Sequence, residues 1–299
     1  SGILWQENSR GLTLEMGGFH GESLEQVHWA AKQSTGMLLV TGPTGSGKTT
    51  TLYTLMEILN TPDVNISTIE DPIEYQMARI NQTQVKPGIG LTFGSGLRSL
   101  VRQDPDIIMV GEIRDQETAS LAVNAALTGH LVLSTLHTNS SAGTMPRMLD
   151  MGVEPFLLVS TINLIIAQRL VRQLEKNHTS YFLSAAELKK LGQLIDLDSM
   201  LAWLKEENIV GPEIGWDKVP FHKPQPSEGS PDGYGGRIGI HEVLKMSPTI
   251  KELVMKGATS DAIEAQAKQE GMHTMIEEGV FKAVQGVTSL EEVLRVISE

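Results

Sequence analysis

Three features are missing from this 299-residue sequence: cysteine, a long uninterrupted hydrophobic run and an excess of basic residues. Without cysteine the chain can form neither a disulfide framework nor a thiolate metal site, which fits a reducing compartment. The longest apolar stretch, residues 153–167, is shorter than the roughly 18–20 residues that span a bilayer, and we expect a buried helix there. No signal peptide is expected, because no basic region followed by an apolar core opens the chain. A net charge of −12 argues against bulk nucleic-acid binding, which needs a basic surface.

Short apolar runs alternate with helical patterns over the first two-thirds of the chain. The runs are typical of buried parallel strands, and they cover residues 37–41, 66–69, 107–110 and 131–135. Between them, residues 50–59 and 119–127 carry apolar side chains at helical spacing. This alternation predicts βαβ units and therefore an α/β domain with a parallel sheet.

The pattern changes in the last third of the chain. Ser184 and Glu187 have the spacing of a helix capping box. Residues 220–236 are rich in Pro, Gly and Ser, which predicts a loop or linker. A strand and turn are expected over residues 237–244, and a helical tail follows whose first helix starts at Pro248.

A glycine-rich loop follows the first apolar run and precedes a helical pattern. Its spacing, Gly42-x-x-x-x-Gly47-Lys48-Thr49, is that of a phosphate-binding P-loop, and the flanking strand and helix are the context that supports one. Glycines let backbone N–H groups turn inward around phosphates, and the helix adds its positive end. We expect Lys48 to bridge the β- and γ-phosphates and the Thr49 hydroxyl to ligate Mg²⁺. The predicted nucleotide-binding residues are Gly42, Pro43, Thr44, Gly45, Ser46, Gly47, Lys48, Thr49 and Thr50.

Acidic residues follow two of the predicted strands. Glu112 comes after the strand 107–110, where it is expected to polarise the attacking water or to hold the metal through water. The alternative is a surface carboxylate at a strand end. Glu70 and Glu74 follow the strand 66–69, at the sheet edge where ligands bind. Either one is expected to assist water activation or Mg²⁺ coordination, with an acidic turn in solvent as the alternative.

Histidines and arginines are the remaining candidates. His137 lies beyond the carboxyl end of its strand and is expected to sense the γ-phosphate, whereas His130 at the entering end is expected to be structural. Arg98, Arg102 and Arg114 surround the Glu112 motif. One of them is expected to complete a neighbouring subunit's site, because arginine neutralises charge that develops on the transferred phosphoryl group. The alternative for these arginines, above all for Arg114, is salt bridges with Asp104, Asp106 and Asp115.

These motifs resemble the motor ATPases of type II secretion and type IV pili, over nearly the whole chain. The P-loop segment 42–53 is similar to the Walker A motif of that family. The other matching segments are 68–75 (aspartate box), 97–115 (Walker B), 129–139 (histidine box), and 167–172 with 233–242, which border a family-specific insertion.

The resemblance implies a RecA-like P-loop NTPase core with a small inserted subdomain and a C-terminal helical domain. In this picture residues 1–22 are the linker from an N-terminal domain, 23–173 the ATPase core, 174–236 the insertion and 237–299 the helical domain. It further implies that Glu112 and Glu74 are the catalytic carboxylates. It places His130 and His137 in the site region.

The resemblance also implies a hexameric ATP hydrolase that drives an inner-membrane platform protein from the cytoplasmic face of the membrane. The long segment after Arg172 is similar to that of assembly or export ATPases, so assembly of a type IV pilus or a type II secretion pseudopilus is expected. Many such ATPases bind zinc through two cysteine pairs in this segment. Here His178 and His222 are too few to replace four ligands, so no zinc is expected.

Three alternative functions stay open. A pilus-retraction ATPase shares the P-loop but lacks the long insertion. A DNA-translocating RecA-like ring needs a basic channel, which the net charge of −12 disfavours. A scaffold that binds ATP without hydrolysing it makes the acids Glu112 and Glu74 superfluous.

Overall fold

The computed structural model describes residues 13–299, and the chain divides into two compact units. The first unit contains the chain up to Gln168 together with His241–Met272. The second unit contains Arg169–Ile240 together with His273–Glu299. Each unit is therefore built from two separate stretches of sequence.

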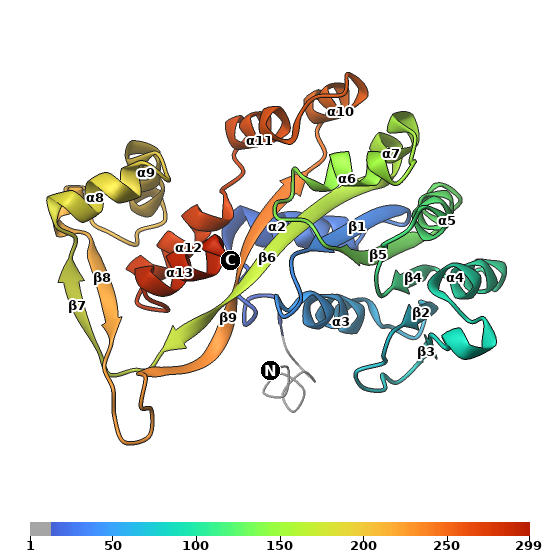
Figure 1. Ribbon diagram of the computed structural model, residues 1–299, viewed down its shortest axis with the longest axis horizontal. Helices are drawn as coiled ribbons and strands as arrows, with labels where there is room; N and C mark the ends of the chain where they lie inside the picture. Colours follow the sequence, from blue (N-terminus) through green and yellow to red (C-terminus); the bar gives the residue numbers. More distant parts are fainter. Residues whose placement is uncertain (1–12) are drawn as a thin grey trace. The chain divides into compact units, whose positions relative to one another are not determined.

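Two long strands explain why both units are discontinuous (Figure 1). Strand β6 (Ile162–Leu174) runs from the first unit into the second, and strand β9 (Tyr234–Lys245), its neighbour in the sheet, runs back. This division differs from the consecutive predicted segments 23–173, 174–236 and 237–299. Of the linker expected over residues 1–22, the first twelve residues lie outside the described part of the chain.

Five short strands of the first unit are β1 (Gly36–Thr41), β2 (Ile66–Glu70), β3 (Ile80–Gln84), β4 (Ile107–Val110) and β5 (Leu131–Leu136). With β6 and β9 they form, among the described residues, one sheet in the order β3-β2-β4-β5-β1-β6-β9. β1 pairs in parallel with β5 and β6, and β2 pairs in parallel with β3 and β4. The predicted parallel sheet is confirmed. The edge strand β3 is partly exposed and polar, so no apolar run predicts it.

Helices cover both faces of this sheet. One face carries α4 (Phe93–Arg102), α5 (Gln116–Leu127), α6 (Thr144–Asp150), α7 (Pro155–Thr161), α10 (Pro248–Met255) and α11 (Ser260–Gln269), and the other carries α2 (Gly21–Ala31) and α3 (Lys48–Leu59). Successive side chains of β1 alternate between the two cores: Met37 and Leu39 pack in the first, and Leu38 and Val40 in the second. Full burial of such a side chain contributes about 2 kcal/mol. Burial on both faces therefore holds β1 firmly in the interior of the sheet, between β5 and β6.

The stretch 153–167 is only partly helical, contrary to the expectation of one buried helix. Helix α7 ends at Thr161 and β6 begins at Ile162. The strand pairs in parallel with β1, and the Asn163 amide donates to the Thr35 carbonyl at 2.9 Å. The open edge of β1 therefore decides a conformation that a short apolar run leaves ambiguous between helix and strand.

Two helix starts in the first unit differ in their capping. α2 begins at Gly21, and the side chain of its N-cap residue His20 makes no capping hydrogen bond. α10 begins at Pro248 as predicted, and the Ser247 side chain caps it. Over the part of the chain that the structure describes, no helix is both long and apolar enough to cross a membrane.

The second unit has its own core. Its elements are β7 (His178–Phe182), α8 (Ala185–Gly192), α9 (Leu197–Glu206), β8 (Pro220–Pro224), α12 (Met275–Val284) and α13 (Leu290–Ser298). The Trp203 ring stacks on the His273 ring, with 3.6 Å between the ring centroids, and its centroid lies 4.3 Å from that of Phe281. The capping box expected at Ser184 and Glu187 is confirmed at the start of α8. β8 pairs with β7 where only a loop is predicted, because its prolines mask a strand at a sheet edge.

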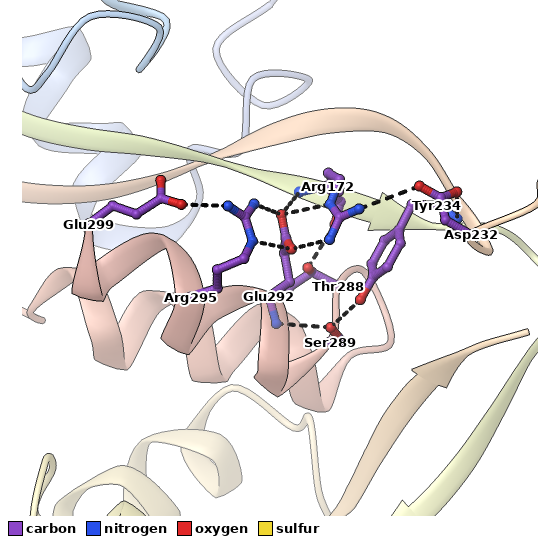
Figure 2. A network of polar contacts seen from close by, with 8 residues as sticks. All are labelled: Arg172, Asp232, Tyr234, Thr288, Ser289, Glu292, Arg295 and Glu299. Atoms are coloured by element: carbon purple, nitrogen blue, oxygen red, sulfur yellow. Dashed lines mark hydrogen bonds and ion pairs between the residues drawn. The ribbon is translucent and has the colours of Figure 1, made fainter.

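Glu292 of α13 is the centre of a polar network in the second unit (Figure 2). Its side chain is 1% exposed and accepts hydrogen bonds from the Nη2 atoms of Arg172 and Arg295, both at 2.8 Å. The Arg172 guanidinium also lies over the Tyr234 ring at 4.2 Å, and the Tyr234 hydroxyl is 2.6 Å from Ser289 Oγ. Burial alone would raise the pKa of Glu292, but the two arginines outweigh it and hold the pKa at about 2. The network fastens α13 to β6.

Replacing this carboxylate by an amide should lower stability in a pH-dependent way. Glu292→Gln is expected to reduce the free energy of unfolding at neutral pH by on the order of 3 kcal/mol, because it leaves two arginines without their anionic partner. The folded pKa of about 2 lies below the ordinary value of 4.5, so the parent has this contribution in full above about pH 4.5 and loses it as the pH falls toward 2. The difference in free energy of unfolding between the parent and the variant therefore shrinks as the pH falls from about 4.5 toward 2. Urea unfolding at a series of pH values measures it.

Glu291→Gln is the matched control, because Glu291 is an exposed acid on the same helix. It should change the free energy of unfolding by less than about 0.5 kcal/mol at any pH. A Glu292→Gln difference that stays constant down to about pH 2.5 would contradict the assignment of the low pKa to Glu292.

Candidate nucleotide-binding site

The glycine-rich loop joins the carboxyl end of β1 to the first turn of α3. Gly42 has a φ of 152°, and a Cβ there would lie 2.6 Å from the Ser46 hydroxyl oxygen and 2.7 Å from the Gln168 carbonyl oxygen. Gly47, with a φ of 85°, is the N-cap of α3, so no side chain covers the free N–H groups of the first turn. The loop therefore presents backbone donors at the positive end of a helix, an arrangement that suits phosphate.

Gln168 of β6 fastens this loop from the side. Its Nε2 donates to the Ser46 carbonyl at 2.8 Å, and its Oε1 accepts from the Thr51 hydroxyl at 2.9 Å. The residue is 1% exposed, so losing either bond leaves a buried polar group unsatisfied at a cost of about 1–3 kcal/mol. Sequence reasoning did not single out Gln168. The sequence feature that could have identified it is a polar amide side chain directly after an apolar run. Such a residue is expected to be buried, and a buried amide needs hydrogen-bond partners.

Lys48, His137 and Glu112 form a hydrogen-bonded row beside the loop. Lys48 Nζ lies 3.2 Å from His137 Nδ1, and His137 Nε2 lies 2.8 Å from Glu112 Oε1. An ammonium group only donates and a carboxylate only accepts, so a neutral imidazole with its proton on Nε2 completes the row. Lys48 also donates to the Gly42 carbonyl. The structure thus brings together three residues that the sequence analysis proposed separately.

The loop that carries His137 is held on two sides. The Thr138 N–H donates to Thr41 Oγ1 at 2.9 Å, which ties this loop to the end of β1. On the other side, Ser141 donates to Glu242 Oε1 through its N–H at 3.0 Å and through its hydroxyl at 2.6 Å. Glu242 is buried. Both anchors fix the position from which the imidazole reaches Lys48.

Glu112 follows β4, and the backbone around it is fixed. The Ile113 N–H donates to the Thr135 carbonyl at 3.0 Å, and the Thr135 hydroxyl donates to the Gly111 carbonyl at 2.6 Å. Arg114 Nη1 lies 3.9 Å from Glu112 Oε2. Arg114 is therefore paired with Glu112 rather than with a neighbouring aspartate, which corrects the alternative considered for it.

The two acids after β2 lie in different environments. Glu74 is exposed on the loop after the strand, and within residues 13–299 its carboxylate has no hydrogen bond or ion pair. Glu70 is the last residue of β2, is 2% exposed, and has its carboxylate engaged by protein donors. Of the two candidates left open by the sequence, Glu74 is the one that can meet a ligand.

Three other residues named by the sequence analysis are not part of the row. His130 is buried at the amino end of β5, where its Nδ1 donates to the Pro105 carbonyl at 2.7 Å. It is structural, which corrects its assignment to the site region. Arg98 forms an exposed ion pair with Glu117 at 3.2 Å, and Arg102 is exposed at the end of α4. Their role toward a neighbouring subunit stays a prediction.

The oxygen donors of the site fit magnesium. Thr49 is exposed in the first turn of α3, and Glu112 ends the row that begins at Lys48. Mg²⁺ is usually held by one or two protein oxygens together with substrate phosphates and water. Residues 13–299 contain no cluster of three or more His, Asp or Glu that could hold a metal ion on its own. The expectation of no zinc stays a prediction.

Comparison with known proteins assigns the chain to a family. The family model described as "Type II/IV secretion system protein" matches residues 3–295. The chain belongs to this family. It is 50% identical over 283 residues to the type II secretion system protein E of Xanthomonas campestris pv. campestris, and 46% identical over 282 residues to the type IV pilus assembly ATPase PilB of Pseudomonas aeruginosa. Each match covers 94% of this chain and 47% of the relative, so the chain spans about half the length of these curated relatives.

Among solved structures, the fold is similar to a crystal structure of the pilus retraction motor PilT with bound ADP. The TM-score is 0.66 at 27% sequence identity, and the match covers 95% of this chain and 66% of that one. The expected α/β, RecA-like P-loop fold is confirmed. The family member described here thus has the phosphate-binding loop in its usual strand–loop–helix setting.

Adding one methyl group to the loop should strongly weaken nucleotide binding. In Gly42→Ala the new Cβ meets the Ser46 side chain and the Gln168 backbone oxygen, so the loop must shift. Binding of a fluorescent ATP analogue is expected to weaken by at least about 100-fold, which corresponds to about 2.7 kcal/mol. Gly88→Ala is the control, because a Cβ there meets nothing within 4 Å. Parental affinity in Gly42→Ala would show that nucleotide does not occupy this loop.

Proposed function

We propose that this chain is the ATP-hydrolysing part of a motor that assembles a type IV pilus or a type II secretion pseudopilus. One observation carries the proposal: the row Lys48–His137–Glu112 connects the P-loop lysine to an acid through a single imidazole. Its members lie at the carboxyl ends of β1, β5 and β4, which are neighbours in the sheet. That edge is where ligands bind in open α/β sheets.

ATP binds with its phosphates in the loop 42–50. Backbone N–H groups at the start of α3 hold the phosphate oxygens, and Lys48 contacts the β- and γ-phosphates. Mg²⁺, when bound, neutralises negative charge on these phosphates. The Thr49 hydroxyl and, partly through water, the Glu112 carboxylate are its protein ligands.

His137 senses the γ-phosphate. An anionic phosphate oxygen is a stronger partner for an ammonium group than a neutral imidazole nitrogen. The arriving phosphate therefore takes Lys48 away from His137 Nδ1, while Glu112 keeps its hydrogen bond from Nε2. The row breaks at one defined contact, and His137 Nδ1 loses its donor when the γ-phosphate is present.

Glu112 is the general base. A water molecule attacks the γ-phosphorus, its proton passes to the Glu112 carboxylate, and the bond to the β–γ bridging oxygen breaks so that ADP leaves. Glu74 is exposed on the loop after the neighbouring strand β2 and supports the water or the metal. Two carboxylates then approach the phosphates from adjacent strands.

The motor is a homohexamer at the inner face of the cytoplasmic membrane, and it acts on an inner-membrane platform protein. Arg98 and Arg102 reach the nucleotide of a neighbouring subunit. The relative at 46% identity is named an assembly ATPase, while the retraction motor PilT is 27% identical, and this difference supports assembly over retraction. The net charge of −12 weighs against a DNA translocase.

Hydrolysis and binding should separate in two variants. Glu112→Gln is expected to lower steady-state phosphate release by about 100-fold while binding of a fluorescent ATP analogue stays within about twofold, because only the base is lost. Lys48→Ala should lose both, since the lysine contacts the phosphates in the ground state as well. Phosphate release and analogue titration measure the two quantities.

Glu206→Gln, an exposed acid of α9 in the second unit, is the control and should keep the parent rate. If Glu112→Gln hydrolyses ATP at the parent rate, Glu112 is not the base. Stimulation of turnover by added DNA would favour the translocase alternative instead.

A further inference from the structure

A buried carboxylate without a cationic partner lies close to the proposed site. Glu70 is 2% exposed, and within the described residues no lysine, arginine or histidine forms an ion pair with it. Neutral donors surround it: the Thr68 hydroxyl at 2.6 Å and the Gln82 Nε2 at 3.2 Å, both on Oε2, and the Tyr53 hydroxyl on Oε1. Burying an acid is costly unless its oxygens are hydrogen-bonded, so this set of donors calls for an explanation.

Tyr53 connects this carboxylate to the P-loop helix. It belongs to α3, which begins at Lys48, and it is 1% exposed. Its hydroxyl donates to Glu70 and accepts from the Glu74 N–H at 3.1 Å. Burial raises the pKa of the Tyr53 phenol, and its hydrogen bond to Glu70 raises it further, so the phenol keeps the proton that it donates. One hydroxyl thus joins α3, the end of β2 and the backbone of Glu74.

Side chains of the sheet hold the rest of the loop that carries Glu74. Gln82 of β3 accepts from the Met77 N–H at 2.8 Å and donates to the Tyr75 carbonyl at 3.0 Å. Gln84 of the same strand accepts from the Ile73 N–H at 3.2 Å. This stretch has no regular secondary structure, so its backbone groups depend on these side chains.

We propose that Glu70 and Tyr53 are positioning residues, which set the place of the loop carrying Glu74 relative to the P-loop helix. The inference rests on the proposed catalytic role of Glu74. Glu70 fixes the direction of the Tyr53 hydroxyl, and that hydroxyl fixes the Glu74 N–H. The exposed Glu74 carboxylate therefore lies on a loop whose position relative to α3, the helix that follows the P-loop, is fixed by these hydrogen bonds.

Tyr53→Phe removes only the hydroxyl and keeps the ring, which packs edge-on against Tyr75. We expect kcat for ATP hydrolysis to fall about tenfold, as for one lost positioning hydrogen bond, while the Kd of a fluorescent ATP analogue changes less than about twofold. In a Glu74→Gln background the same change should have no further effect on kcat. The Tyr53 hydroxyl acts on kcat only by positioning the Glu74 carboxylate, and this variant no longer has that carboxylate. Tyr181→Phe, in the second unit, is the control.

Amide hydrogen exchange tests the positioning without relying on turnover. In Tyr53→Phe the peptide that contains Glu74 should exchange about tenfold faster, because its N–H loses the phenol oxygen as acceptor. The Tyr181→Phe control should leave exchange at Glu74 at the parent rate. Glu70→Gln should also speed this exchange, since an amide cannot accept from all three donors.

The outcomes separate this inference from the proposed function. If Glu74→Gln lowers kcat and Tyr53→Phe does not, or if the two losses add, the positioning role is overturned and the catalytic role of Glu74 stands. If Tyr53→Phe weakens the Kd of the ATP analogue by the same factor as it lowers kcat, the positioning role is also overturned, because the phosphate site itself has then changed.

If Glu74→Gln leaves turnover at the parent value, the proposed role of Glu74 fails. The exchange measurement then decides: faster exchange at Glu74 supports positioning, and unchanged exchange overturns it.

Discussion

The place of β1 inside the sheet, between β5 and β6, is the constraint on which the site depends. Its neighbours β5 and β6 pair with it on both sides, and its side chains are buried on both faces. The ends of β1 and β5 bring Thr41 and the loop after Leu136 to one edge, and Gln168 of β6 follows Ala167, the strand partner of Thr41. The P-loop starts from this edge, so its position follows from the hydrophobic core and from strand pairing. Only the final orientation of each polar group is left to local hydrogen bonds.

Buried carboxylates supply much of that local fixation. Glu70 and Glu242 in the first unit, and Glu292 in the second, are each at most 3% exposed. Each accepts hydrogen bonds from a neighbouring segment of chain: Glu70 from Tyr53, Glu242 from Ser141 and Glu292 from Arg172. A carboxylate accepts several bonds at once, and breaking one of them leaves a costly unsatisfied group. Such acids therefore specify a single arrangement of the segments that they join.

Motif spacing predicted the parts of the site that depend on local sequence. The P-loop, the acid Glu112 after its strand, and His137 beyond the next one follow from strand–loop–helix order, and the parallel sheet then brings them to a common edge. The identity of a partner across the sheet was not predictable. Gln168 and Glu70 lie within or beside apolar runs, which indicates burial, but their partners Ser46 and Tyr53 come from distant positions. The strand β6 was missed for the same reason, because the edge of β1 decides its conformation.

Both candidate catalytic acids are connected by hydrogen bonds to the first two turns of α3. Glu112 is connected to Lys48 through His137, and the backbone of Glu74 is connected to Tyr53. The acids follow β4 and β2, yet neither position is independent of the helix that begins at the phosphate-binding loop. A phosphate that draws on Lys48 acts on the first connection and leaves the second intact, because Tyr53 is held by buried Glu70. In the proposed function, the loop that carries Glu74 therefore stays in place when nucleotide binds, whereas Glu112 and His137 lose their connection to Lys48.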